Sequence, residues 1–132
     1  KDTLNSRVKF REWFRPFAPI VSKNNFKKYF SMDVESPYMM NAVEVNPGMI
    51  PKIPAIVHVD GTARVQTVCP VYQKDLHDLL ENFEKRTGIG VLLNTSFNVK
   101  GQPIVETPVQ AVETFKSTAI DMLVLENCLL QK

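Results

Sequence analysis

A short apolar strand that runs directly into a cluster of small polar side chains constrains this chain more than any other feature. Residues Val91–Leu93 are typical of a buried strand, because three large apolar side chains follow one another. Four polar side chains follow within the next few positions: Asn94, Thr95, Ser96 and Asn98. Ligands in open α/β sheets bind beyond the carboxyl ends of strands. The segment therefore predicts a sheet with a ligand site where this strand ends.

The same polar side chains could simply cap the strand and begin a turn. Four such side chains within five positions, however, are more than a turn needs. Ser96 lacks the G-x-S-x-G context of a hydrolase nucleophile, and no Ser-His-Asp arrangement is evident. We therefore interpret Ser96 as a hydrogen-bonding group for ligand oxygens rather than as a nucleophile.

Composition places the chain among ordinary globular proteins. Its 132 residues suggest one domain, residues 1–132, and its 44% apolar and 23% charged content is that of a soluble protein. The net charge of +2 argues for neither nucleic acid nor a membrane as partner. No signal peptide is visible at the start, but the chain begins without Met, so we expect an excised piece of a longer protein in which a missing targeting signal carries little weight. We expect the protein to be cytoplasmic.

Helical signals are strongest in two places. Lys74–Arg86 carries an apolar stripe and is followed by Gly88 as a C-cap. A second helix is expected to start at the N-cap Thr107, with a capping box. The first residues could close a helix, and Asn25–Phe30 can form one or two turns. The stripe consists of Leu76, Leu79, Leu80 and Phe83.

Strands alternate with these helices. The turn signal Asp60-Gly61 joins two of them into an expected hairpin. A hairpin among interleaved helices predicts an α/β fold built on a mixed sheet. The expected strands are Ala18–Val21, Tyr38–Val45, Ile56–Val59, Ala63–Val68, Val91–Asn94 and Met122–Leu125, the last followed by a short polar tail.

Three cations recur in the segment Lys9–Pro19. In an extended chain Lys9 and Arg11 point to the same side, and with Arg15 they could hold one phosphate or carboxylate. The alternative is a solvated basic loop. We expect neighbouring aromatic side chains to fix this loop against the body of the protein, and the charged side chains to lie outside the core. The aromatic residues are Phe10, Trp13, Phe14 and Phe17.

Near the expected hairpin turn, Arg64 could make either a turn-stabilising salt bridge or a contact to an anion. Asp60 and Thr62 could serve the turn alone. His58 is expected to be packed and hydrogen-bonded, whereas His77 falls on the polar face of its helix and is expected to be exposed.

The two cysteines, Cys69 and Cys128, lie in apolar contexts without CxxC spacing, which predicts buried, reduced thiols. Too few ligands cluster in the sequence for a structural zinc site.

Five collinear motifs resemble the C-terminal region of the O-carbamoyltransferases of the nodulation and antibiotic-tailoring type. The resemblance covers nearly the whole chain, and it implies a YrdC-like twisted mixed sheet with flanking helices. It includes a K-x-R signature at Lys9–Arg11 and an S-x-N signature at Ser96–Asn98. The five motifs are KFREWFRPFAP, SPYM, PAIVHVDGTARVQTV, TGIGVLLNTSFNVKGQPIVETP and TAIDMLVLEN.

The resemblance also implies an activity. Carbamoyl phosphate and ATP, with Mg²⁺ brought by the nucleotide, would form carbamoyl-adenylate with release of pyrophosphate. A separate N-terminal domain of the ASKHA type, carrying iron, would then transfer the carbamoyl group to a hydroxyl acceptor. That domain and an upstream G-x-R-A-L-G-x-R segment are absent from this sequence, so the fragment alone is expected to be weakly active or inactive. Gly90 replaces a commoner proline, and Gln102 a commoner glutamate.

The site expected from the resemblance combines cations with hydrogen-bonding groups and has no protein-bound metal. The alternatives are an RNA-binding module of YrdC-like fold and a docking scaffold without chemistry. The catalytic cations are Lys9, Arg11 and Arg64, and the substrate-binding groups are Asn94, Ser96, Asn98, Arg15 and Thr62.

Overall fold

A computed structural model describes all residues, 1–132, and shows two compact units. We call residues Lys1–Arg15 together with Ser96–Lys132 the terminal unit, and residues Pro16–Thr95 the central unit. No helix in either unit is long and apolar enough to cross a membrane. The expectation that residues 1–132 function as a single domain stays a prediction.

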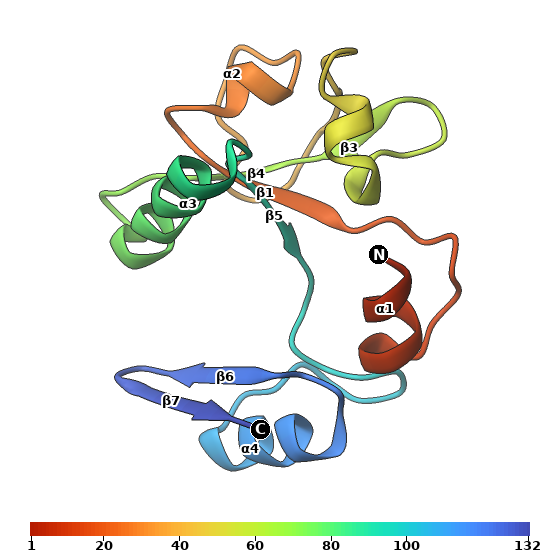
Figure 1. Ribbon diagram of the computed structural model, residues 1–132, viewed down its shortest axis with the longest axis vertical. Helices are drawn as coiled ribbons and strands as arrows, with labels where there is room; N and C mark the ends of the chain where they lie inside the picture. Colours follow the sequence, from red (N-terminus) through yellow and green to blue (C-terminus); the bar gives the residue numbers. More distant parts are fainter. The chain divides into compact units, whose positions relative to one another are not determined.

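The central unit is built on a three-stranded mixed sheet, as predicted. Strand β1 (Ala18–Ser22) lies between β4 (Gln66–Val68), which is parallel to it, and β5 (Val91–Asn94), which is antiparallel (Figure 1). In this register Pro19 pairs with Leu93, next to the polar end of β5. The middle strand is the most deeply buried of the three, because it has a neighbour on both edges.

Helix α3 (Lys74–Thr87) packs against this sheet and confirms the predicted helix. Gly88 follows it in the left-handed conformation with φ +77°, which is the predicted C-cap. Leu80, 1% exposed, is the centre of a cluster that contains Ile20, Val68, Leu76 and Leu92. The buried stripe of α3 is narrower than predicted, because Leu79 is 54% exposed.

His77 on α3 is buried, so its predicted exposure is wrong. The loop after β1 covers this face of the helix, and the side-chain nitrogen of Asn24 lies 3.3 Å from His77 Nε2. A partner from a distant loop is invisible to a helical pattern read from the sequence alone.

A polar network ties α2 (Phe26–Tyr29) to α3. The Glu84 carboxylate accepts hydrogen bonds from Lys28 and from Tyr29 Oη, the latter at 2.9 Å. Tyr29 Oη in turn accepts the N–H of Gly90 at 2.6 Å. A proline at Gly90 has no N–H, so it could not make this bond.

The predicted hairpin that begins at Ile56 is wrong. Residues Pro54–Ile56 form a 3₁₀ turn, and no strand follows before the Asp-Gly turn. Strand β3 (Thr62–Arg64) instead pairs antiparallel with β2 (Ala42–Glu44), which is shorter than the strand predicted there. Ile56 ends this 3₁₀ turn, so the predicted strand begins on a residue whose backbone is helical rather than extended.

The turn itself forms as predicted. The N–H of His58 donates to Thr62 O at 2.8 Å, and Gly61 adopts a left-handed conformation with φ +81°. His58 Nδ1 lies 3.0 Å from Thr62 Oγ1, which confirms the predicted hydrogen-bonded histidine.

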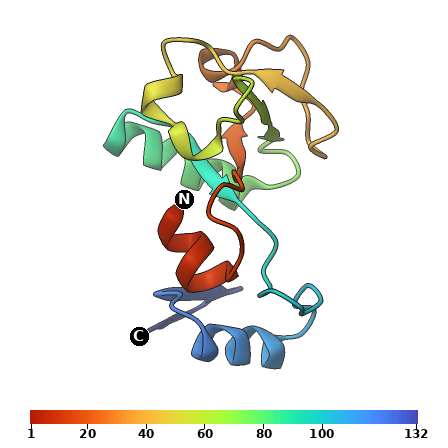
Figure 2. The ribbon, with the colours of Figure 1, turned by 90° about the vertical axis from the view of Figure 1, so that its right-hand side faces the viewer.

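The terminal unit contains a helix and a hairpin from the last part of the chain. Helix α4 (Pro108–Ser117) has the predicted capping box at Thr107. It packs along the hairpin of β6 (Met122–Leu125) and β7 (Cys128–Gln131) through an apolar cluster around Phe115 (Figure 2). The predicted polar tail after β6 is therefore wrong.

The two cysteines are both free. Cys69 is half-buried and Cys128 is exposed at the start of β7. The predicted burial is wrong for Cys128, because a two-stranded hairpin covered by a helix on one face leaves its other face in solvent.

Candidate functional site

Lys9 holds the S-x-N segment of the terminal unit. Helix α1 (Asp2–Leu4) continues into a π-helical turn, Asn5–Lys9, which ends in Lys9. The Lys9 ammonium donates to Ser96 O at 2.8 Å, to Asn98 O at 2.7 Å and to Asn98 Oδ1 at 2.8 Å. These three contacts match the three N–H donors of an ammonium group.

The burial of Lys9 corrects one expectation from the sequence. Its residue is only 7% exposed, so this charged side chain belongs to the interior of the terminal unit. Its hydrogen-bond partners are main-chain oxygens, a hydroxyl and an amide oxygen, and all of them are neutral. Its positive charge is therefore solvated by the protein but not neutralised.

The S-x-N segment is also ordered by its own hydrogen bonds. Ser96 Oγ donates to Asn98 Oδ1 at 2.7 Å, and Asn98 Nδ2 donates to Gln102 O at 2.8 Å. The Asn98 side chain thus bridges the segment and the following loop. Such a segment is arranged before any ligand arrives, which reduces the entropic cost of binding.

Asn5 orders the basic loop, and sequence reasoning missed it. This side chain is 1% exposed. Its Oδ1 accepts from Arg11 Nε at 2.8 Å, and its Nδ2 donates to Arg15 O at 3.0 Å and to Trp13 O at 3.3 Å. A single asparagine near the end of a helix gives no periodic signal, so only the fold reveals this role.

The conformation of the basic loop differs from the extended chain that we expected. Phe10 adopts a left-handed backbone with φ 49°, directly between Lys9 and Arg11. Lys9 and Arg11 nevertheless line the same cavity, because the left-handed residue between them turns the chain back, where a strand would rely on alternating side chains.

The K-x-R and S-x-N segments enclose a cavity of about 280 Å³, which we call the cationic cavity. Its size is near the lower end of that of small-molecule sites. All five predicted site residues of the terminal unit line this cavity: Lys9, Arg11, Arg15, Ser96 and Asn98. Lys100 adds a further cation, and Glu12 is the one carboxylate among the lining side chains.

Burial, and after it the crowding of like charges, shifts the pKa values at this cavity. Burial lowers the pKa of the Lys9 ammonium, and the charge of Arg11 lowers it further. Burial also lowers the pKa of Arg11, with a contribution from Arg15 that exceeds the opposing effect of Glu12. An anionic ligand would relieve this repulsion, because an opposite charge favours the protonated cations.

The expected aromatic anchoring of the basic loop is wrong for three of the four rings. Phe17 is 2% exposed, but Phe10, Trp13 and Phe14 are 52%, 74% and 61% exposed. The loop is held by the amide of Asn5 instead of by burial of its aromatic side chains.

The remaining predicted site residues belong to the central unit. Thr62 Oγ1 donates to Asp60 Oδ1 at 2.7 Å, so it stabilises the turn. Arg64 is exposed on β3, and Asn94 Nδ2 donates to Gln66 Oε1. The prediction that Thr62, Arg64 and Asn94 act together with the cationic cavity stays a prediction.

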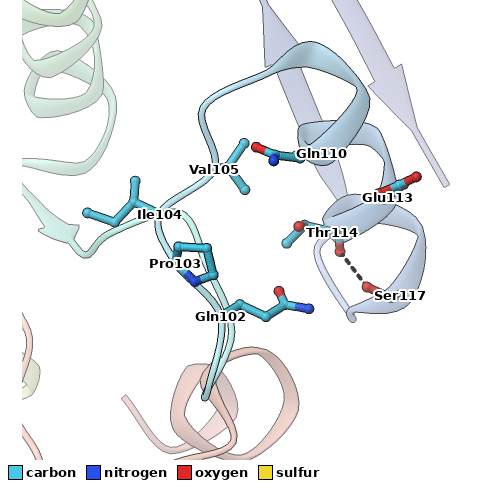
Figure 3. Close-up of a pocket in the computed structure, with 8 residues that line it drawn as sticks. All are labelled: Gln102, Pro103, Ile104, Val105, Gln110, Glu113, Thr114 and Ser117. Atoms are coloured by element: carbon cyan, nitrogen blue, oxygen red, sulfur yellow. Dashed lines mark hydrogen bonds between the residues drawn. The ribbon is translucent and has the colours of Figure 1, made fainter.

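A second cavity of the terminal unit, of about 350 Å³, lies between the loop 102–105 and α4 (Figure 3). Its lining includes the Glu113 carboxylate and the hydroxyl of Ser117, with Pro103 and Ile104 as an apolar wall. It contains no cation, so it lacks the charge that distinguishes the cationic cavity. No group of three or more His, Cys, Asp or Glu side chains in the chain could hold a metal ion.

Comparison with known proteins identifies relatives along the whole chain. The family model described as "Carbamoyltransferase C-terminus" matches residues 1–132. Nodulation protein NolNO of Sinorhizobium fredii is 41% identical over 135 residues, covering 100% of this chain and 20% of that protein. Nodulation protein NolO of Bradyrhizobium diazoefficiens is 39% identical over 135 residues, covering 100% and 25%. An uncharacterized protein of Synechocystis is 42% identical over 152 residues, covering 100% and 25%.

The chain spans a quarter or less of the length of these relatives. The matches nevertheless include every segment that builds the cationic cavity, because they run from the first residue to the last. By this match over its full length, the chain belongs to the carbamoyltransferase C-terminus family.

Proposed function

We propose that this chain binds carbamoyl phosphate and ATP and forms carbamoyl-adenylate, which another part of a longer carbamoyltransferase then uses to modify a hydroxyl group. The observation that carries the proposal is the cationic cavity, in which the K-x-R and S-x-N segments meet although 89 positions separate Lys9 from Asn98. Membership of the carbamoyltransferase family supports the class of reaction.

The charges of the cavity suit this chemistry. Both substrates are phosphate anions that repel one another, and charge develops at phosphorus during adenylation. Such a reaction depends on positioning and electrostatic stabilisation. The guanidinium groups of Arg11 and Arg15 can each hold a phosphate through paired N–H groups, and Lys100 adds charge at the same cavity.

The balance of atoms defines two steps. Water first releases inorganic phosphate from carbamoyl phosphate and leaves carbamate. A carbamate oxygen then attacks the α-phosphorus of ATP, and pyrophosphate leaves with the electron pair of the broken P–O bond. Magnesium, bound to the nucleotide, would neutralise charge on the departing pyrophosphate.

The side chains of the S-x-N segment have donors and acceptors for the carbamoyl group. Ser96 and Asn98 would orient its amide and oxygen atoms, while Lys9 keeps the segment in place. The roles of Arg64, Thr62 and Asn94 of the central unit as anion and hydrogen-bonding contacts stay a prediction.

The proposal is tested by separating the two half-reactions in the intact protein. Asn98→Ala should suppress the carbamoyl-phosphate-dependent exchange of labelled pyrophosphate into ATP. The same variant should still transfer the carbamoyl group when carbamoyl-adenylate is supplied. Ser117→Ala, in the same unit but at the other cavity, is the matched control and should leave exchange unchanged.

The two alternatives predict other results. A docking scaffold predicts that exchange survives in Asn98→Ala while transfer fails. An RNA-binding module predicts that neither half-reaction changes, and that salt-dependent RNA binding weakens instead. Either result would contradict the adenylate-forming proposal.

A further inference from the structure

The loop that carries the arginines of the cationic cavity also displays aromatic rings to solvent. Trp13 is 74% exposed and Phe14 is 61% exposed. Large aromatic side chains are normally buried over most of their area. The exposure of two adjacent rings in one short loop therefore calls for an explanation outside core packing.

Trp13 is held in place although its ring is exposed. Its carbonyl oxygen accepts a hydrogen bond from the buried Asn5 amide at 3.3 Å, and the next bond of that amide fixes Arg15. The N–H of Arg15 donates to Glu12 O at 3.3 Å, which closes a turn around Trp13. Phe14 meets the Trp13 ring edge to face, with centroids 6.0 Å apart. The ring is thus displayed on an ordered loop.

The position of Trp13 links it to the cationic cavity. It lies two residues from Arg11 and two residues from Arg15, and both of these line the cavity. All peptide bonds are trans, so the Cα of Trp13 is no more than about 7.6 Å from the Cα of either arginine. Any polyanion bound by these arginines would have its next chemical group within reach of the ring.

We propose that Trp13 is the stacking platform for the purine base of a nucleoside triphosphate whose phosphates occupy the cationic cavity. The inference deepens the proposed function and rests on it. A nucleotide joins a flat π-system to a polyanion. The loop offers a matching pair of groups, an exposed indole for the base and two guanidinium groups for the phosphates. Aromatic side chains stack on bases without needing hydrogen bonds to them, and the larger purines should gain more than pyrimidines.

Lys1 does not prevent this stacking. Its ammonium lies 6.0 Å from the centroid of the Trp13 ring, at the outer limit of a cation–π contact. Such a contact at an exposed site is weak, so a base can displace the lysine or occupy the opposite face of the indole.

The test is calorimetric titration of the intact protein with ATP, CTP and inorganic tripolyphosphate, which has the charges but no base. Trp13→Ala should weaken ATP binding about five- to hundred-fold and leave tripolyphosphate affinity unchanged. Trp13→Phe should retain most of the ATP affinity, and the preference for ATP over CTP should shrink in Trp13→Ala. Tyr72→Ala removes a ring that is 86% exposed in the central unit and is the matched control.

Arg15→Met should give the complementary pattern, in which ATP and tripolyphosphate weaken together. Unchanged ATP affinity in Trp13→Ala overturns the stacking inference, and so does an equal loss for ATP and tripolyphosphate. Failure of the unmodified protein to bind either ligand overturns the proposed function itself, which separates the two failures. A fall in the melting temperature of Trp13→Ala with ATP affinity intact would assign the ring to packing and also overturn the inference.

Discussion

Replacing Lys9 by Met should loosen the S-x-N segment, because one ammonium holds both of its ends. Met keeps an unbranched apolar chain in the buried position but removes all the hydrogen bonds of the ammonium. The change leaves two main-chain acceptors, Ser96 O and Asn98 O, without this donor, whereas Asn98 Oδ1 keeps its hydrogen bond from Ser96 Oγ.

The magnitude follows from these contacts. Hydrogen bonds to a charged group contribute roughly 1.5–3 kcal/mol each. Two effects reduce the total, since Ser96 is exposed and can bind water, and since the ammonium no longer has to be desolvated. We expect the local opening free energy of this region to fall by about 2–4 kcal/mol.

Hydrogen exchange in the intact protein measures this loss. The N–H of Val105 donates to Phe97 O at 2.9 Å, so it reports on the segment. Its exchange should accelerate roughly thirty- to several-hundred-fold in Lys9→Met. Lys100→Met removes the same charge from an exposed position at the same cavity, and it should change the opening free energy by less than about 0.5 kcal/mol. Equal effects of the two variants would refute the clamp and attribute the change to net charge.

Three further changes test the central unit. Burial would raise the pKa of Glu84, but hydrogen bonds from Lys28 and Tyr29 outweigh it and lower that pKa below the ordinary 4.5. Between the lowered pKa and the ordinary one, the folded state binds fewer protons than the unfolded state. Stability should therefore decrease as pH falls from the ordinary pKa through the lowered one. In Glu84→Gln, denaturation curves measured against pH should lack this decrease. Gly90→Ala places a Cβ against the Glu84 carboxylate and should cost about 1–3 kcal/mol in urea denaturation; an unchanged midpoint would show that Glu84 can move aside. Leu80→Ala, at a side chain 1% exposed, should lower the free energy of unfolding by about 2–5 kcal/mol, and a loss below about 1 kcal/mol would contradict its central place in the core.

Local signals in the sequence predicted local structure well. The capping box at Thr107 and the C-cap at Gly88 depend on residues within one turn, and both are present. Pairing between strands was harder to predict, because the partner of β3 is β2 across a long loop. The turn signal near Gly61 suggested the nearest segment as partner, but that segment starts in a 3₁₀ turn and forms no strand.

The candidate site was predicted in outline. The motifs identified Lys9, Ser96 and Asn98, which the fold brings into contact. No pattern in the residues pointed to Asn5, because its partners include two main-chain oxygens that only the folded loop places nearby. The sequence also led to the wrong environment for Trp13, since aromatic content alone does not distinguish a buried ring from a displayed one.

Titration of the intact protein with carbamoyl phosphate tests the central claim most directly. Loss of one charge-assisted contact of roughly 1.5–3 kcal/mol should weaken binding by about one to two orders of magnitude in Arg15→Met. Arg7→Met removes an exposed arginine near the start of the same unit that does not line the cationic cavity, and it should leave the affinity unchanged. Unaltered binding in Arg15→Met, or an equal loss in Arg7→Met, would contradict the assignment of this cavity as the carbamoyl phosphate site.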